Sequence, residues 1–390
     1  MNNSMGKFTL KCKDVDVAEF SYDERQGIEI HDVLASEYLP VLIQTRGYSR
    51  KSFDQWMSYR NIPKTRRNLA ELLETYGVED TMALSMQNLG LSLSDSYWFC
   101  PVNSGLAWEA VNLYQNDFMG ATEHEGHSDE NWSGGPYHPD STSNGDLEKH
   151  WCIEAGKRML YKASVTPYCM EAYSEVFASR LLDALGISHV VYNVMDDGMM
   201  AYSVCEAFTS PDIEFVPAYF ITEHYHQLPS AKRYPYLLRQ MEKLEIPVNE
   251  KDLQIMLAFD CLISNSDRHL GNFGFLRNVE DLEFIGMAPL FDNGTSMWGT
   301  SLVTDISLRN QKAKPFYNSH DKQMDIVKEG LELFEHLTDD FLLQLVQDVY
   351  SQNHRINETR IEKMGNMLTG ARNKLAYLQK KNSRRAGNGR

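Results

Sequence analysis

Residues 266–272 read Ser-Asp-Arg-His-Leu-Gly-Asn, and residues 291–294 read Phe-Asp-Asn-Gly. Asp267 begins the polar set, Asn272 follows five residues later, and Asp292 belongs to an Asp-x-Gly sequence downstream. Phosphoryl transfer to a hydroxyl needs such a set, because one carboxylate orients and deprotonates the acceptor while an amide and a second carboxylate hold magnesium. Magnesium prefers oxygen ligands and usually takes one or two protein carboxylates. The spacing therefore predicts Asp267 as a base, with Asn272 and Asp292 as metal ligands.

The flanking sequence predicts how these side chains converge. A helix leading into residue 264 is indicated by apolar residues at helical spacing, namely Leu253, Met256, Leu257 and Cys261. Two short apolar runs, 273–276 and 284–289, predict a hairpin. Because a hairpin brings its two ends together, Asn272 at its entrance and Asp292 past its exit are expected to reach one metal ion. This order of elements favours a functional site over two unrelated polar turns.

The composition is that of an ordinary globular protein and argues against several classes. The 390 residues are 42% hydrophobic and 24% charged, and the chain is long enough for two or three domains. A net charge of −16 disfavours broad attraction to nucleic acid or anionic lipid. The sequence lacks an apolar run near the roughly 20 residues of a membrane helix, and residues 1–7 lack a secretory signal layout. We expect a cytoplasmic protein without a membrane or a direct nucleic-acid partner.

Residue patterns divide the chain into four parts. Residues 1–122 predict an N-terminal module that mixes α and β structure, with a hairpin over 14–30 and a helix ending at Tyr76. Residues 123–216 begin with a His-, Ser- and Gly-rich linker and continue as hairpin, helix and strands, the order of a small nucleotide-binding lobe. Residues 217–380 predict a mainly helical lobe, and residues 381–390 a basic flexible tail. The six cysteines form no Cys-x-x-Cys pair, so we expect free, buried thiols.

Residues 263–274, Ile-Ser-Asn-Ser-Asp-Arg-His-Leu-Gly-Asn-Phe-Gly, together with 287–292, Met-Ala-Pro-Leu-Phe-Asp, resemble the catalytic core of HipA-type serine/threonine kinases. That family has a protein-kinase-like fold related to the phosphoinositide kinases, which also carry an Asp-Arg-His-x-x-Asn run. The resemblance spans residues 140–330 approximately. It implies an α+β, bilobal fold with a small β-rich nucleotide lobe and a helical C-lobe. It also implies ATP and Mg²⁺ as cofactors, Asp267 as the catalytic base, and Asn272 and Asp292 as the magnesium ligands.

The same resemblance gives candidate ATP contacts upstream. Lys162 has the setting of the strand lysine that neutralises the α- and β-phosphates, with a solvated surface lysine as the alternative. Glu175 resembles the helix glutamate that pairs with this lysine, and Glu171, one turn earlier, is the competing candidate. Glu206 and Phe208 follow a predicted strand and are candidates for the hinge that binds adenine.

Residues 141–149, Ser-Thr-Ser-Asn-Gly-Asp-Leu-Glu-Lys, resemble the loop that covers the phosphates in this family. Small residues let backbone N–H groups approach an anion closely, which makes Ser143, Asn144 and Gly145 candidate ATP contacts. A plain linker turn is the alternative. In some family members a serine of this loop is autophosphorylated, which ejects the loop and disables nucleotide binding. Ser141, Thr142 and Ser143 are therefore candidate autophosphorylation sites.

Two further sequence features bear on the predicted site. His269 is a candidate catalytic residue that either exchanges protons or orients the catalytic loop through a hydrogen bond, and we favour the orienting role. A basic cluster after Asp292 consists of Arg309, Lys312 and Lys314. It is suited to an acidic or phosphorylated substrate segment, with a solvated loop as the alternative.

The resemblance implies a Mg-dependent ATP:protein serine/threonine phosphotransferase, with ATP and a protein substrate as partners. Many family members are toxins restrained by a small DNA-binding antitoxin, so an antitoxin is a further candidate partner. Residues 1–122 do not match the usual N-terminal subdomain of the family, which leaves a freestanding kinase equally open. A small-molecule or lipid (phosphoinositide-like) kinase and a catalytically silent nucleotide-binding module are the competing functions.

Overall fold

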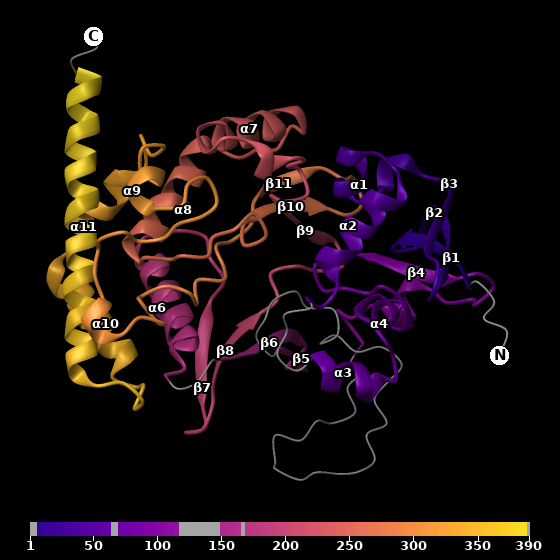
Figure 1. Cartoon of the computed structure of the whole chain (residues 1–390), viewed down its shortest axis with the longest axis horizontal. Helices are drawn as coiled ribbons and strands as arrows, with labels where there is room; N and C mark the ends of the chain where they lie inside the picture. The colour runs from indigo at the N-terminus through magenta and orange to yellow at the C-terminus, as the bar shows by residue number, and fades with distance from the viewer. Residues whose placement is uncertain (1–5, 64–68, 117–148, 165–167, 388–390) are drawn as a thin grey trace. The chain divides into compact units, whose positions relative to one another are not determined.

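The computed structural model describes residues 6–63, 69–116, 149–164 and 168–387 (Figure 1). Two compact units account for the chain. The N-terminal unit comprises Met1–Tyr161, Glu206–Val216 and Leu276–Glu283. The C-terminal unit comprises Lys162–Cys205, Pro217–Phe275 and Phe284–Arg390. The predicted catalytic stretches, 266–272 and 291–294, both belong to the C-terminal unit.

The N-terminal unit contains an antiparallel sheet with the strand order β3-β2-β1-β4. Its strands are β1 (Gly6–Cys12), β2 (Val15–Asp23), β3 (Gly27–Val33) and β4 (Tyr97–Pro101). Helix α2 (Arg50–Arg60) begins with a capping box between Ser49 and Ser52. Its Phe53 packs its ring 5.2 Å from Phe20 of β2 and 6.1 Å from Phe99 of β4. Aromatic burial therefore attaches this helix to the sheet.

The other helices of the N-terminal unit are short. They are α1 (Val41–Arg46), α3 (Leu69–Tyr76), α4 (Thr81–Gln87), α5 (Trp108–Val111) and the 3₁₀ helix η1 (Ser36–Tyr38). A buried network crosses this unit, in which Arg277 Nε donates 2.5 Å to Glu214 and Arg277 Nη2 donates 3.1 Å to the Tyr97 hydroxyl. These charges are paired, so we interpret the network as structural.

The described residues form two further sheets. One has the order β5-β6-β8-β7, from β5 (Lys149–Glu154), β6 (Lys157–Ala163), β7 (Tyr192–Asp196) and β8 (Ala201–Glu206). Helix α6 (Met170–Ala184) joins β6 to β7, as the hairpin–helix–strand pattern predicted. It ends at Ala184, and Gly186 follows the C-cap residue Leu185 with a φ of +65°, which suits glycine. The other sheet has the order β11-β10-β9, from β9 (Ile213–Pro217), β10 (Gly274–Asn278) and β11 (Phe284–Met287).

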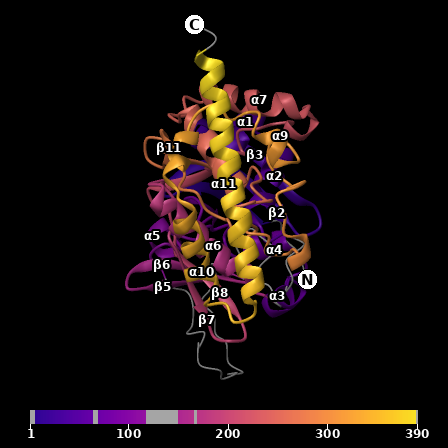
Figure 2. The same ribbon diagram turned by 90° about the vertical axis from the view of Figure 1, so that its left-hand side faces the viewer.

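The rest of the C-terminal unit is helical. It comprises α7 (Ser230–Lys243), α8 (Glu250–Leu262), α9 (His320–Gln323), α10 (Asp339–Tyr350), α11 (Glu358–Gly387) and the 3₁₀ helices η3 (Tyr225–Gln227), η4 (Val303–Asp305) and η5 (Leu331–His336). Every residue of α8 from Leu253 to Leu262 is buried, so this helix forms the centre of the core. The long helix α11 packs beside α8 (Figure 1) and beside α10 (Figure 2).

Three observations bear on what the sequence predicted for the C-terminal tail, for a membrane span and for the cysteines. Helix α11 continues to Gly387, so residues 381–387 are helical where the sequence predicted a flexible tail. Lysine and arginine are good helix formers and are favoured at a helix C-terminus, where they oppose the helix dipole. Within the described residues, no helix combines the length and the apolar character needed to cross a membrane. The cysteines are free, and Cys152 is the one that is only partly buried.

Candidate active site

The candidate active site is built outward from the end of α8. Asp260, in the last turn of this helix, and Arg268, in the catalytic stretch, both have fully buried side chains. Arg268 Nη2 donates 2.9 Å to Asp260 Oδ1, and Arg268 Nε donates 3.1 Å to Asp260 Oδ2. Burial alone would lower the pKa of Arg268, but the Asp260 carboxylate raises it above its ordinary value. The pair is therefore ionised and fixes the start of the catalytic stretch on the core.

Arg268 also joins the two sequence stretches to each other. Its Nη1 donates 2.9 Å to the carbonyl of Asn272 and donates to the carbonyl of Phe291 as well. Its Nη2 donates to Oδ1 of Asn293. One buried guanidinium thus holds the neighbourhoods of Asn272 and Asp292 together, which is the convergence that the predicted hairpin required.

A second set of hydrogen bonds shapes the loop around Asp267. The Asp267 N–H donates 3.1 Å to Oδ1 of Asn265, and Asn265 Nδ2 donates 2.9 Å to Asp260. Asn272 Nδ2 donates 3.0 Å to the Asp267 carbonyl, which turns its amide oxygen away from this bond. The Asp267 carboxylate itself forms an ion pair with Lys314. One hydrogen-bonded loop thus carries both the Asp267 carboxylate, which can accept a proton, and the amide oxygen of Asn272.

The candidate nucleotide and metal residues meet at a single cluster. Lys162 Nζ lies 3.3 Å from Glu175 Oε1 and forms an ion pair with Asp292. Burial alone would lower the pKa of Lys162, but the carboxylates of Asp292 and Glu175 raise it above its usual range. Burial raises the pKa of Glu175, against the opposing effect of Lys162. Glu171, the competing candidate, instead accepts a 2.8 Å hydrogen bond from the Ser164 hydroxyl.

The turn at Asp292 explains why an Asp-x-Gly sequence occurs here. Asp292 has a φ of +56°, a left-handed conformation that costs a non-glycine residue of order 1 kcal/mol and is commonest at functional sites. The next N–H, of Asn293, donates 2.7 Å to Glu175 Oε2 and holds the turn. A Cβ at Gly294 would lie 3.3 Å from Glu175 Oε1 and 3.3 Å from Glu171 Cβ. Glycine therefore lets the turn approach helix α6 closely.

His269 is held as a neutral ring. Its Nδ1 accepts a 3.0 Å hydrogen bond from the N–H of Gly271, which leaves Nε2 to carry the proton. Burial lowers the pKa of His269 below its ordinary value, although the Asp267 charge opposes this effect. These contacts agree with the orienting role that we favoured for this histidine.

The remaining candidates do not join this cluster. Glu206, the last residue of β8, forms a 2.6 Å ion pair with Lys157, and the Phe208 ring packs 5.5 Å from that of Phe215. Both belong to the N-terminal unit. The predicted phosphate loop and autophosphorylation sites lie outside the described residues; they are Ser141, Thr142, Ser143, Asn144 and Gly145.

Two residues that contact the catalytic stretch, Asp260 and Lys314, were not predicted as site residues. Asp260 offers a weak signal, since it is an acidic residue in an otherwise apolar helical run seven positions before Asp267. Lys314 was noted only as part of a basic cluster, 47 residues after Asp267. Its contact with Asp267 depends on the folding of the intervening chain and has no local sequence signature.

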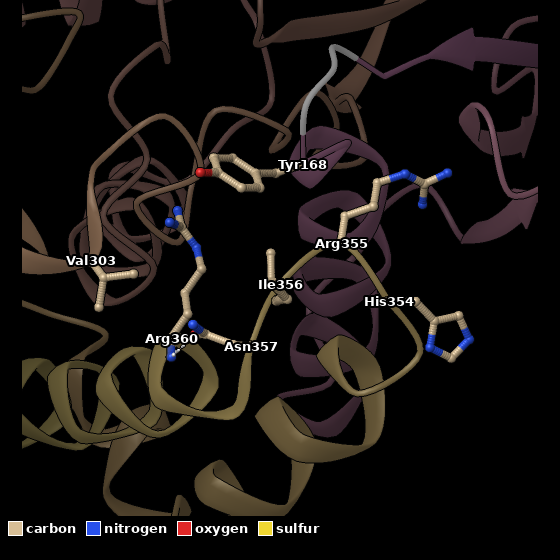
Figure 3. A pocket seen from close by; sticks show the side chains of 7 residues that line it. All are labelled: Tyr168, Val303, His354, Arg355, Ile356, Asn357 and Arg360. Carbon is tan, nitrogen blue, oxygen red and sulfur yellow. Dashed lines mark hydrogen bonds between the residues drawn. The ribbon is translucent and has the colours of Figure 1, made fainter.

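A cavity of about 290 Å³ lies elsewhere in the C-terminal unit (Figure 3). Its lining includes Tyr168, Arg355 and Arg360, and the Arg360 side chain extends toward the Tyr168 ring at 5.3 Å. Both arginines are already engaged. Arg355 is paired with Asp196, and Arg360 donates to backbone carbonyls, including that of Trp298 at 2.8 Å. We assign no ligand to this cavity.

Comparison with known proteins supports the fold. No protein-family model and no curated protein sequence matches this chain. Among solved structures, the Helicobacter pylori proinflammatory kinase CtkA matches with a TM-score of 0.47 and 17% identity, over 61% of this chain and 95% of that one. HipA, from the Shewanella oneidensis MR-1 toxin–antitoxin complex with HipB and operator DNA, matches with a TM-score of 0.56 and 13% identity.

The HipA match covers 96% of this chain and 99% of that one. The match therefore extends over most of residues 1–122 as well. The predicted α+β, protein-kinase-like architecture is confirmed, and this chain has a fold similar to that of HipA.

Proposed function

We propose that this protein is a magnesium-dependent kinase that transfers the γ-phosphoryl group of ATP to a serine or threonine of a protein. The observation that carries the proposal is the cluster in which Lys162 contacts both Glu175 and Asp292. A buried lysine shared by a helix glutamate and an Asp-x-Gly aspartate is the arrangement that protein kinases need for phosphate and metal binding.

The donor atoms in this cluster suit magnesium. The Asp292 carboxylate and the Asn272 amide oxygen are hard oxygen ligands on the two stretches that Arg268 joins. When bound there, the metal would neutralise charge on the nucleotide phosphates. Lys162 is held by Glu175 and stays positively charged, because its pKa is raised. It would therefore shift from Asp292 toward the α- and β-phosphates as Asp292 takes up the metal.

Asp267 would accept the proton of the attacking hydroxyl. Its carboxylate is 37% exposed, so an acceptor side chain can reach it. His269 supports this group by holding the loop, through the bond between its Nδ1 and the Gly271 N–H. Most of the catalysis would come from positioning and charge neutralisation, since the transferred group leaves loosely in most phosphoryl transfers.

A direct experiment tests this function. Purified protein is incubated with radiolabelled ATP and magnesium, alone and with generic protein acceptors such as casein, and with inositol and phosphoinositide vesicles as separate samples. Label on serine or threonine of a protein, lost in Asp267→Asn, supports the proposal. Label on inositol or lipid alone would identify a small-molecule or lipid kinase instead. Nucleotide binding without transfer to any acceptor would identify a silent binding module.

We also propose a small protein partner of the antitoxin kind, because the fold is shared with a HipA that was solved together with HipB and operator DNA. The acidic charge of −16 argues that such a partner, rather than this chain, would supply any contact with nucleic acid. Co-expression with the protein encoded beside it, followed by size-exclusion chromatography, tests this. A stable complex supports the partner, and separate elution of the two proteins contradicts it.

A further inference from the structure

Lys314 is the feature of the candidate site that the proposed mechanism leaves unused. Its ammonium group forms an ion pair with Oδ1 of Asp267. The Lys314 side chain is 51% exposed, whereas the Lys162 side chain is 14% exposed and lies between two carboxylates. Lys162 is therefore largely enclosed, whereas Lys314 is an accessible cation that contacts the predicted base.

The backbone under Lys314 is fixed by one fully buried side chain, that of Gln323. Gln323 Nε2 donates 2.7 Å to the Lys314 carbonyl, and its Oε1 accepts from the N–H groups of Phe316 at 3.2 Å and Tyr317 at 3.3 Å. The Tyr225 hydroxyl donates 2.8 Å to the carbonyl of the intervening residue, Pro315. A buried glutamine whose three hydrogen bonds all go to one turn indicates that the position of this turn matters.

A second buried residue attaches the same segment to the catalytic loop. His320, on α9, is 2.9 Å through Nε2 from the carbonyl of Asn265. Burial lowers the pKa of His320, so the ring is neutral and Nε2 can donate its proton to this carbonyl. Asn265 in turn accepts the N–H of Asp267. The backbone of Lys314 is thus held in position relative to Asp267, while its four-carbon side chain remains free to rotate.

We propose that Lys314 is a further catalytic residue, whose ammonium group leaves Asp267 when ATP and the acceptor bind and then contacts the γ-phosphoryl oxygens. This inference rests on the proposed kinase function. In the transfer step the acceptor oxygen forms a bond to the γ-phosphorus, and the bond from that phosphorus to the β–γ bridging oxygen breaks. The hydroxyl proton passes to Asp267, and ADP leaves with the bridging oxygen. Lys314 forms no covalent bond and balances charge on the group in transit.

The distances that the transfer requires bring the γ-phosphoryl oxygens within reach of the Lys314 ammonium group. A hydroxyl that gives its proton to Asp267 must lie about 2.6–3.2 Å from the carboxylate. Its oxygen must lie about 3–3.5 Å from the phosphorus that it attacks. An ammonium group that can touch the same carboxylate therefore needs only a rotation of its stem to reach the phosphoryl oxygens. Removing one preorganised donor to developing charge costs an enzyme about 10²–10³-fold in kcat.

The test compares Lys314→Met with Lys322→Met, a matched loss of an exposed lysine in the same segment. ATP turnover is measured with magnesium and the best acceptor found for the parent protein. Lys314→Met is expected to lose about 10²-fold in kcat with little change in the KM for ATP, at an unchanged melting temperature, while Lys322→Met behaves like the parent. Added n-propylamine is expected to restore part of the activity of Lys314→Ala and none of that of Asp267→Asn.

Each remaining outcome decides against the proposal. Parent-like kcat in Lys314→Met would make Lys314 a surface counterion of Asp267. A loss of activity that follows a lowered melting temperature, or that amine leaves unrestored, would make the lysine structural. If the parent protein transfers no phosphate at all, the kinase function itself fails and this inference fails with it. A working parent with an unaffected Lys314→Met overturns the inference alone.

Discussion

Removing the carboxylate of Asp260 tests how the catalytic stretch is held. The side chains of Asp260 and Arg268 are both 0% exposed, and three hydrogen bonds join them. Breaking a buried ion pair by deleting one partner costs about 3–5 kcal/mol, because the other charge stays buried without compensation. Arg268 keeps its bonds to the Asn272 and Phe291 carbonyls, which neutralise less charge than a carboxylate does. We therefore expect Asp260→Ala to destabilise the protein by about 3 kcal/mol, the low end of that range.

Urea unfolding followed by tryptophan fluorescence measures this loss. Asp321→Ala is the matched control, because Asp321 also pairs with a cation, Lys374, but has a side chain that is 63% exposed. A surface pair is worth about 0–1 kcal/mol, so the control should unfold close to the parent. A double variant, Asp260→Leu with Arg268→Met, should recover much of the stability, since it leaves no buried charge. Equal, small losses in Asp260→Ala and Asp321→Ala would refute the reasoning.

Three other changes probe the site and the core. Lys162→Met should weaken binding of a fluorescent ATP analogue at least tenfold, because the cation is lost, and should also lower the melting temperature, because Glu175 is left buried without its partner; unchanged binding would contradict the assignment of Lys162. Gly294→Ala should lower kcat more than Gly47→Ala, since its Cβ would lie 3.3 Å from Glu175 Oε1, whereas at Gly47, with a φ of +82° and nothing within 4 Å of the added Cβ, the strain of an alanine should lower stability instead; equal rates would contradict the close approach. Stability should fall as the pH falls below 6.5, because burial holds the pKa of His320 below this ordinary value and only the unfolded chain then takes up the proton. The fall should be smaller in His320→Gln, as measured by urea unfolding at pH 7.5 and 5.5.

The parts of the site that the sequence predicts are those set by local geometry. Asp267 and Asn272 lie on one loop, and a hairpin of two short strands brings Asp292 back to them. Lys162 lies in β6, and Glu175 lies in α6, the next helix along the chain. The relation of Asp267, Asn272 and Asp292 follows from residue spacing and the predicted hairpin, whereas the pairing of Lys162 with Glu175 was implied by the family resemblance.

The parts that the sequence does not predict depend on packing between distant segments. Lys314 reaches Asp267 because the buried Gln323 fixes its backbone, and a glutamine in a polar segment carries no sign of that role. Asp260 and Arg268 lie eight residues apart, and residue spacing alone does not indicate that they form a buried ion pair. The basic end of α11 suggested disorder from its charge alone, although the same residues are favourable for a helix C-terminus.

The most direct test of kinase function is phosphate transfer from ATP by the parent protein and by Asp267→Asn, measured side by side with magnesium and a protein acceptor. Our account predicts label on serine or threonine with the parent and a rate about 10²–10⁴-fold lower in the variant, with ATP binding unchanged in both. A variant that transfers phosphate as fast as the parent would contradict the role of Asp267. A folded parent that binds ATP and magnesium but labels no acceptor would contradict the kinase assignment itself.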